Sequence, residues 1–508
     1  MNDNLREQLI LLPDYFRGHL VLTVTAMAVG IAVSIPLGIV AAEFARVKRP
    51  VLTIVSIIQT FPSLAILALV VALLGGRIGF VPAFVALTLY SMLPIVRNTV
   101  TGLESVSDDV IEAATGIGMT SKQILLKVRL PLALPIIIAG VRTATVWTVG
   151  MATLSTLVGA TSFGNYIFTG IQTRNLIAVT VGSIASAIMA VVLDSVIGGV
   201  EWLTKNHIAG TTTRNVRLAR LAVGTMTATI LVLTAFAFIP KPKPDFVIGA
   251  KGFTEQYIIA GLLAATLEQA GYRAEQRLGL GTDIVYEATR HGTVDLYLEY
   301  TGTVWANHLE REDNPGRVAV RDAVIRYIDL QDGMSSIGTA GFQNLYALAM
   351  RRDRAEELGV KTIEDLIPIA DKLACGADLE FFGRPEWYRV RDTYNMDFGE
   401  KLTFDTALMY TAVHERQVDL ITAYTTDGRV AAYDLVIIED PRDALLPYDG
   451  LYVASSRAAA IPGFIEALSP LIGAISDEAM RKANKMVDVD GKPITEAVDF
   501  LRDHTSGN

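Results

Sequence analysis

The sequence predicts two kinds of domain in one chain of 508 residues: an all-α polytopic membrane domain of six spans, fused to an α/β two-lobed domain. Three observations predict this division. Six apolar runs fill the first half, each near the roughly 20 residues that a helix needs to cross a bilayer. The proline-rich run PKPKPD begins at residue 240. After it, short strand patterns alternate with amphipathic helical patterns, as in an α/β domain.

Charge is divided unevenly between the two halves. Residues 1–244 carry 18 Lys and Arg against 10 Asp and Glu, whereas residues 245–508 carry 26 against 43. The first half is therefore net positive and the second net negative. We take residues 1–239 as the membrane domain, 240–244 as a semi-rigid proline-rich linker, and 245–508 as a separate external domain.

The membrane domain is expected to cross the bilayer six times, at residues 20–42, 51–74, 80–102, 133–159, 176–200 and 217–239. Lys and Arg gather in the loops after the first, third and fifth runs, so the positive-inside rule places these loops in the cytoplasm. The chain after residue 239 is then extracytoplasmic, and the protein is predicted to be a multi-pass protein of the inner (plasma) membrane. Pro36, Pro62 and Pro94, inside the first, second and third runs, predict kinks there.

Among the charged residues inside predicted spans, Arg142 in the fourth and Asp194 in the fifth are the clear cases. A charge inside lipid is costly, so each needs a partner or a function. Because both lie toward the predicted cytoplasmic end, a structural or gating role is favoured over contact with a substrate.

A polar stretch, EAATGIGMTSKQILLKVRLP, separates the third and fourth spans at residues 112–131. Glu112, Ala113 and Ala114 favour a helix that Gly116 and Gly118 break. Thr120 or Ser121 can cap a second short helix, which we expect to run from Lys122 to Arg129. Pro131 then ends the polar stretch, where the next apolar run begins.

The spacing of this stretch resembles the EAA loop of ABC importer permeases. The residues that carry the resemblance are Glu112, Ala113, Ala114, Gly118, Leu130 and Pro131. In that family the loop is a coupling helix that seats in a cytosolic ABC ATPase. An ordinary amphipathic loop is the alternative. The sequence has no GxxxxGK[ST] phosphate loop, so a separate chain is expected to hydrolyse ATP. One permease unit per chain further suggests a homodimer with two ATPase chains.

The second half begins with a strand pattern, FVIGAK, followed by a helical pattern up to Gly271. Further strand patterns end at Tyr300, Met350, Tyr424 and Asp440. Alternation of strands with helices predicts mostly parallel sheets whose loops form a cleft. The two lobes are expected to be discontinuous, at about 245–340 plus 445–508, and 341–444.

The motifs KGFTEQ, GTDI, DLYLEYTGT, AYTTDGR and LPYDG resemble the binding proteins of osmoprotectant ABC importers, over nearly all of residues 245–508. The two resemblances imply a type I ABC importer permease-like domain fused to a type II periplasmic-binding-protein domain. The family recognises glycine betaine, carnitine, choline and related quaternary amines. Its tyrosine box implies roles here for Tyr300, Tyr346, Tyr424 and Tyr448. Its carboxylate clamp implies roles for Lys251, Thr303 and, on a less distinctive motif, Arg384.

The chemistry of such a ligand agrees with these residue types. A trimethylammonium group donates no N–H hydrogen bond, so selective capture relies on aromatic faces that attract a cation by about 0.5–2 kcal/mol per ring. Arginine and lysine can hold a carboxylate, arginine through two parallel hydrogen bonds. Each tyrosine alone could equally be a strand residue in the core.

Two rival functions remain open from the sequence. Another trimethylammonium zwitterion, such as ergothioneine, would satisfy the same box and clamp. A membrane receptor that senses such a solute without transporting it is less favoured, because it needs neither six spans nor a coupling loop. The scattered histidines and the single Cys375 predict no metal site, and no cofactor is expected in this chain.

Overall fold

The computed structural model describes residues 3–173, 175–211, 213–239 and 242–506, and the chain divides into two compact units. The helical unit comprises Met1–Ile167 and Thr180–Pro242, and the α/β unit comprises Phe168–Val179 and Lys243–Asn508. Residues 240 and 241 of the predicted linker lie outside the described residues.

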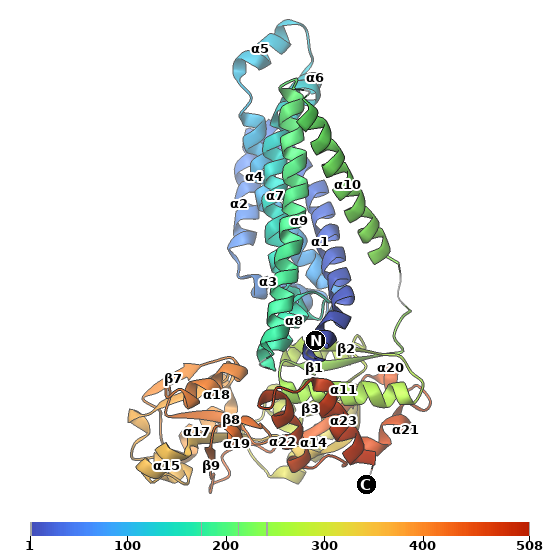
Figure 1. Cartoon of the computed structure of the whole chain (residues 1–508). Coiled ribbons are helices and arrows are strands. Elements are labelled where there is room, and N and C mark those ends of the chain that lie inside the picture. The colour runs from blue at the N-terminus through green and yellow to red at the C-terminus, as the bar shows by residue number, and fades with distance from the viewer. Residues whose placement is uncertain (1–2, 174, 212, 240–241, 507–508) are drawn as a thin grey trace. The chain divides into compact units, whose positions relative to one another are not determined.

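The first half of the chain consists of helices joined by short connections, and α1, α4, α9 and α10 are its longest labelled helices in Figure 1. The helices are α1 (Asp3–Glu43), α2 (Ala45–Thr60), α3 (Ser63–Leu73), α4 (Phe80–Glu104), α5 (Asp108–Gly116), α6 (Ser121–Ile124), α7 (Leu130–Ala152), α8 (Gly164–Gln172), α9 (Leu176–Ile208) and α10 (Arg214–Ala237). Leu103 of α4 packs against Ala133 and Ile137 of α7 in the core of this unit.

Five helical segments of the described chain are long and apolar enough to cross a membrane, and a sixth crossing is available if α2 and α3 form one bent span. The expected span 51–74 is bent by 101° between these two helices. Proline restricts the residue before it to extended backbone, and Phe61, before Pro62, is extended at φ −65° and ψ 139°. The predicted kink at Pro62 is therefore confirmed.

The polar stretch between α4 and α7 contains the predicted pair of short helices. Glu112 lies in α5, and Gly118 follows that helix with a left-handed φ of +84°. Thr120 caps α6 through a capping box with Gln123. Two short helices joined by a glycine turn were expected, and this part of the prediction is confirmed.

The expectation of a separate second helix that stops at Arg129 is wrong. A π-helical turn, Leu125–Arg129, joins α6 to α7, and Pro131 lies in the first turn of α7. The N–H of Leu130 bonds to the carbonyl of Leu125, one residue further back than in an α-helix. Such a wider turn gives the proline ring room beside the preceding carbonyls. Leu125 and Leu130 also pack on the core of the helical unit, which favours a continuous helix.

Arg142 of α7 and Asp194 of α9 form an ion pair. Nε of Arg142 lies 2.5 Å from Oδ1 of Asp194, and Nη2 lies 2.7 Å from Oδ2. Glu201 of α9 lies 3.8 Å from the same guanidinium. The two charges compensate each other and tie α7 to α9, so neither is left alone in an apolar segment.

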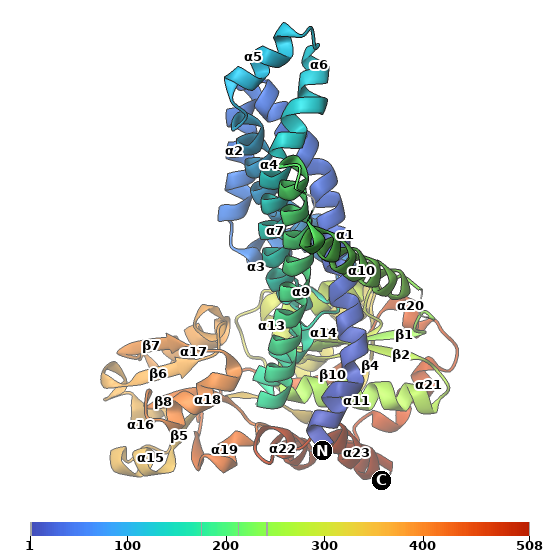
Figure 2. The same cartoon turned by 45° about the horizontal axis from the view of Figure 1, so that its top comes forward.

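The α/β unit contains two five-stranded sheets, whose strands form separate groups in Figures 1 and 2. The first sheet has the order β2-β1-β3-β10-β4 and the second β7-β6-β8-β5-β9. The strands are β1 (Phe246–Lys251), β2 (Ala274–Leu280), β3 (Leu296–Tyr300), β4 (Ser335–Gln343), β5 (Tyr346–Arg351), β6 (Ala374–Ala377), β7 (Glu400–Thr403), β8 (Leu420–Tyr424), β9 (Leu435–Ile438) and β10 (Asp449–Ala454).

Helices pack around both sheets. They are α11 (Thr254–Gln269), α12 (Thr282–Arg290), α13 (Thr301–Asn307), α14 (Arg317–Leu330), α15 (Arg352–Leu358), α16 (Ile363–Leu366), α17 (Pro385–Tyr394), α18 (Thr406–His414), α19 (Arg429–Ala432), α20 (Ser456–Ala459), α21 (Phe464–Leu468), α22 (Asp477–Asp488) and α23 (Ile494–Ser506).

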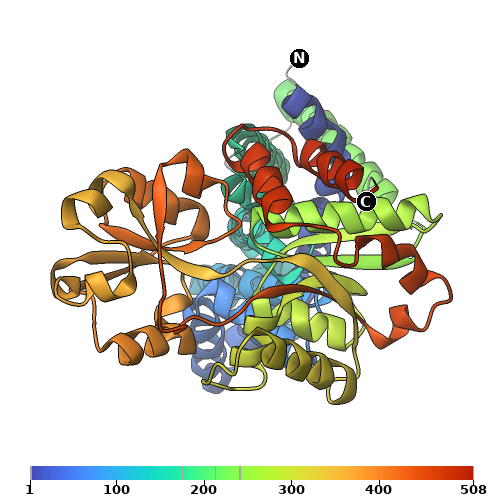
Figure 3. The same ribbon diagram turned by 90° about the horizontal axis from the view of Figure 1, so that it is seen from below.

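Each sheet has four strands that run in one direction and one that is reversed, so the expectation of mostly parallel sheets holds except for that one strand. β10 runs antiparallel to both β3 and β4, and β5 runs antiparallel to both β8 and β9. Both are the first strand after the chain crosses from one sheet to the other, along the two connections visible in Figure 3. A strand that enters from the side where parallel neighbours end must run opposite to them, so one antiparallel strand per sheet follows from the crossings.

Candidate functional site

The crossing topology brings the four sequence-predicted tyrosines to the ends of the strands. Tyr300 is the last residue of β3 and Tyr424 the last of β8. Tyr346 opens the antiparallel β5 and pairs directly with Tyr424. Tyr448 precedes β10, whose Gly450 pairs with Tyr300. The carboxyl edge of parallel strands is where α/β proteins place ligands.

Aromatic contacts link these tyrosines. The ring centroid of Tyr346 lies 5.1 Å from that of Tyr424 and 5.5 Å from that of Tyr448. Phe253 joins Tyr300 to the others, because its ring stacks 6.2 Å from Tyr300 and 6.3 Å from Tyr424. We call these five rings the aromatic cluster. Sequence reasoning missed Phe253, although its place in KGFTEQ, directly after β1, puts it at the same strand edge.

Tyr448 also packs against the backbone of Gly302. A Cβ added at Gly302 would lie 2.4 Å from Cε2 of the Tyr448 ring. Real carbon atoms do not approach so closely, so only glycine leaves room for this ring on the first turn of α13. The glycine of the EYTGT motif thus has a direct packing reason.

Every tyrosine of the aromatic cluster donates its hydroxyl to a buried carboxylate. Burial raises the pKa of each of these phenols well above its usual value, so the phenols remain protonated donors. The pairs are Tyr300 with Glu255 at 2.7 Å, Tyr346 with Asp378 at 2.8 Å, Tyr424 with Asp378 at 2.7 Å, and Tyr448 with Glu386.

The two cations predicted to clamp a carboxylate are ion-paired within the protein in this structure. Lys251 is buried and pairs with the buried Glu299, and its ammonium lies 5.4 Å from the centroid of Tyr300. Arg384 pairs with the buried Glu386 at 3.1 Å and donates to the hydroxyl of Tyr448 at 3.1 Å.

The third predicted clamp residue, Thr303, is buried in the first turn of α13, just after Tyr300. The guanidinium of Arg384 lies 5.9 Å from the centroid of Tyr346. The structure thus places Lys251 and Thr303 near Tyr300, and Arg384 beside Tyr346 and Tyr448. The clamp and box roles themselves stay predictions.

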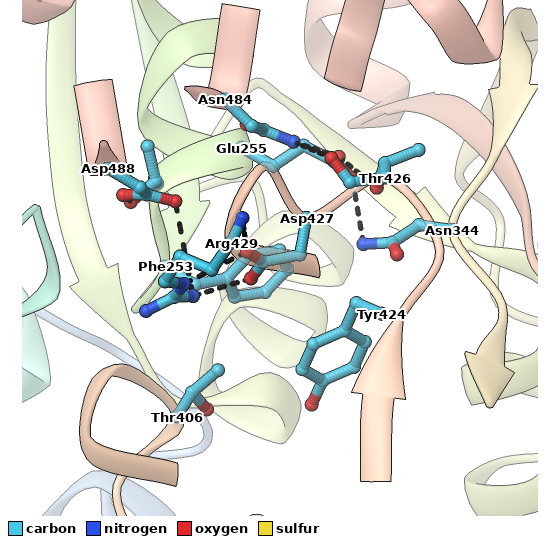
Figure 4. Close-up of a pocket in the computed structure, with 11 residues that line it drawn as sticks. Phe253, Glu255, Asn344, Thr406, Tyr424, Thr426, Asp427, Arg429, Asn484 and Asp488 are labelled. Carbon is cyan, nitrogen blue, oxygen red and sulfur yellow. Dashed lines mark hydrogen bonds and ion pairs between the residues drawn. The ribbon is translucent and has the colours of Figure 1, made fainter. Parts of the chain in front are cut away.

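A small pocket opens beside Phe253 and Tyr424, between residues of both sheets (Figure 4). Its lining residues are Phe253, Thr254, Glu255, Asn344, Thr406, Tyr424, Thr426, Asp427, Arg429, Asn484 and Asp488. Arg429 is held by Asp427 on one side, 2.9 Å from Nε, and lies 3.9 Å from Asp488 on the other. The pocket therefore combines aromatic faces with hydrogen-bonded charged groups.

Glu255 bridges the two sheets at this pocket. One carboxyl oxygen accepts from Tyr300 and, at 3.0 Å, from Asn344, whereas the other accepts from Thr426 at 2.6 Å and Asn484 at 2.9 Å. Burial raises the pKa of Glu255, and the four hydrogen bonds oppose that rise. All four donors are neutral side chains. Because they come from segments of both lobes, this carboxyl group connects the two lobes through hydrogen bonds.

The predicted coupling residues form an exposed element of the helical unit. Glu112 and Ala113 are exposed and Ala114 is buried. Gly118 and Pro131 are exposed, and Leu130 is half-buried. Apolar side chains on the same element are also exposed: Val110 at 40%, Ile117 at 80% and Leu126 at 53%.

Two family models match the chain, one in each half. Residues 244–503 match the substrate-binding domain of ABC-type glycine betaine transport systems. Residues 34–202 match the inner membrane component of binding-protein-dependent transport systems.

Curated relatives match the two halves jointly and separately. An ergothioneine transport permease and ergothioneine-binding protein of Helicobacter pylori is 29% identical over 480 residues, covering 92% of this chain and 85% of that protein. A choline transport system permease of Bacillus subtilis is 42% identical over 183 residues, covering 36% of this chain and 83% of that protein. A glycine-betaine-binding protein of Pseudomonas aeruginosa is 31% identical over 273 residues, covering 51% of this chain and 87% of that protein.

Proposed function

The chain belongs to the ABC-type glycine betaine transport family, with a permease and a substrate-binding domain in one polypeptide, and on that premise we propose that it imports quaternary ammonium compatible solutes. Its ligand is glycine betaine, carnitine, choline or proline betaine. The α/β unit captures the solute and the helical unit passes it across the membrane. The protein is a transporter subunit and not an enzyme.

The observation that carries this proposal is the aromatic cluster with its carboxylates. Four tyrosines and Phe253 converge from the strand ends of both sheets. A cation is attracted to aromatic faces without needing hydrogen bonds. The buried acidic groups Glu299, Asp378 and Glu386 outnumber the two cations Lys251 and Arg384 there. An excess of acidic groups favours a ligand that carries a positive charge.

Ergothioneine is a second candidate ligand. The relative that matches both halves of this chain is an ergothioneine permease and binding protein. Ergothioneine carries a trimethylammonium and a carboxylate, as carnitine does, so the same rings would hold its cationic end. Its sulfur-bearing ring would need additional space beyond the cluster, and the pocket beside Phe253 and Tyr424 is the space that this proposal assigns to it.

ATP hydrolysis comes from a separate cytosolic ABC ATPase in this proposal. The exposed element around Glu112 and Gly118, with Ile117 and Leu126 beside it, is the surface that the ATPase would bind. One permease unit per chain implies a homodimer with two ATPase chains. The helical unit lies in the inner (plasma) membrane, and the α/β unit is extracytoplasmic. Attachment of the receptor to the permease raises its local concentration to about the millimolar range.

Calorimetry on the full-length protein in nanodiscs tests the ligand assignment. The panel is glycine betaine, carnitine, choline, proline betaine and ergothioneine, with glycine and proline as controls that lack a quaternary nitrogen. We expect at least one quaternary ligand to bind and the controls to give no heat. Binding of proline or glycine with no binding of any quaternary ligand would overturn the proposal. Exclusive binding of ergothioneine would select the second candidate.

A further inference from the structure

We propose that Asp378 is a positioning residue that sets the cation selectivity of the site, because its single carboxylate holds and polarises two rings of the aromatic cluster. This inference rests on the proposed function and deepens it. It concerns how the site distinguishes a quaternary ammonium ion from a neutral group of the same shape.

The two oxygens of Asp378 have different tasks. Oδ1 accepts the backbone N–H groups of Glu380 and Phe381, at 2.8 and 2.9 Å. These bonds fix the side chain at the carboxyl end of β6, where it is 5% exposed. Oδ2 is thereby aimed at the aromatic cluster.

Oδ2 accepts the hydroxyls of both Tyr346 and Tyr424, at 2.8 and 2.7 Å. The two phenol oxygens are themselves 3.4 Å apart. Tyr346 comes from β5 and Tyr424 from β8, so one oxygen sets the tilt of two rings on neighbouring strands. The rings lie 5.1 Å apart with an interplanar angle of 44°.

A phenol that donates to a carboxylate gains electron density in its ring. The negative face of the ring then attracts a cation more strongly, and the low dielectric of a buried site enlarges this electrostatic effect. Burial and the nearby charge of Asp378 raise the pKa of Tyr424. The phenol therefore stays neutral and donates a hydrogen bond to this carboxylate. A neutral ligand of the same shape gains nothing from the extra density.

The variant Asp378→Asn separates charge from shape. Asparagine retains an oxygen for the N–H groups of Glu380 and Phe381, and its amide can donate to the two phenol oxygens. The charge is lost while the scaffold is retained. A matched control is Asp419→Asn, at the opposite end of β8. Asp419 accepts the N–H of Ala374 at 3.0 Å and pairs with Arg354 at 3.0 Å.

The measurement is binding by the full-length protein in nanodiscs of two pairs of isosteres. Choline is compared with 3,3-dimethylbutan-1-ol, and glycine betaine with 3,3-dimethylbutanoate, in which carbon replaces the quaternary nitrogen. We expect Asp378→Asn to weaken the cationic member of each pair about tenfold and the carbon isostere less than about threefold. The Asp419→Asn control should leave the affinity ratio of each pair unchanged.

Equal losses for both members of a pair would overturn the inference and make Asp378 a scaffold residue only. Unchanged binding of the cationic member would overturn it as well. If Asp378→Asn does not fold, Tyr424→Phe removes one of the two phenol bonds with Asp378 intact, and its affinity ratio should fall about threefold. An unchanged ratio there would overturn the inference. Failure of the wild-type protein to bind any quaternary ligand would instead overturn the proposed function.

Discussion

Removal of Arg384 should change which ligands the protein accepts. Its side chain is 8% exposed and pairs with Glu386 through two contacts, Nη2 to Oε1 at 3.1 Å and Nε to Oε2 at 3.2 Å. The same guanidinium donates to the hydroxyl of Tyr448 at 3.1 Å. Arg384 is therefore both a candidate ligand contact and half of a buried ion pair.

The single variant Arg384→Gln leaves Glu386 buried without its guanidinium. Breaking a buried pair in this way costs about 3–5 kcal/mol of stability. The double variant Arg384→Gln/Glu386→Gln removes both charges, so it should regain most of this loss. The double variant is consequently the better test of ligand recognition.

If Arg384 holds the carboxylate of a ligand, its loss should weaken glycine betaine and carnitine by about 1.5–3 kcal/mol, the scale of a charged hydrogen bond. That range corresponds to about 10- to 100-fold in affinity. Choline has no carboxylate, so Arg384→Gln should leave its affinity unchanged or improved, and the double variant should weaken it far less than glycine betaine. Both variants are assayed by calorimetry with glycine betaine and choline, and by thermal unfolding.

Equal losses for choline and glycine betaine in the double variant would refute the reasoning. Arg384 would then support the fold or the closure of the lobes, and the clamp would have to be sought elsewhere. Thermal unfolding shows whether the single variant is destabilised as the buried pair requires.

Four further outcomes are expected. Gly118→Val should abolish uptake while ligand binding persists, because it strains a left-handed residue at an exposed surface. The control Gly116→Ala adds a Cβ in open space within a helix and should retain uptake. Tyr424→Ala should weaken every quaternary ligand by about 0.5–2 kcal/mol or more and Tyr424→Phe by less, as measured by calorimetry. Burial raises the pKa of Glu255 above its ordinary 4.5, so the folded protein binds a proton there more tightly than the unfolded chain does. This contribution to stability is full below pH 4.5 and declines as the pH rises through the folded pKa. Denaturant titrations should show a weaker decline in Glu255→Gln. The α/β domain expressed from Asp245 should fold as a soluble monomer that binds the same ligands, which sedimentation and calorimetry would check.

Much of the fold could be predicted from the sequence, because its signals are local. Apolar runs of span length and the glycine at 118 depend only on neighbouring residues, and the predicted kink at Pro62 is confirmed by a bend of 101°. Pro131 shows the limit. Its effect on the helix depends on the π-helical turn before it and on core contacts of Leu125 and Leu130, which no local pattern reveals.

The direction of the strands could not be predicted from their patterns. A buried parallel strand and a buried antiparallel strand have the same apolar composition, and β5 and β10 are reversed only because the chain changes sheet just before each of them. That reversal sets Tyr346 directly opposite Tyr424. The pairing of these two predicted residues is therefore a property of the topology.

The carboxylates behind the tyrosines lay beyond sequence reasoning for a similar reason. Asp378 bonds to Tyr346 and Tyr424 across sequence separations of 32 and 46 residues, and an aspartate at the end of a strand usually faces solvent. Phe253 had a clearer signal, since it lies in a motif already singled out. Aromatic residues in such motifs deserve the same attention as the tyrosines.

ATP-driven uptake by the reconstituted protein tests the central claim, that one chain is both receptor and permease. The full-length protein is placed in proteoliposomes with the ABC ATPase proposed as its partner. ATP is supplied on the ATPase side and radiolabelled quaternary ammonium solute on the side of the α/β domain. The account predicts accumulation that requires ATP, needs no added binding protein, and is lost in Gly118→Val. Ligand binding without any ATP-dependent accumulation would contradict it and would favour a sensory receptor.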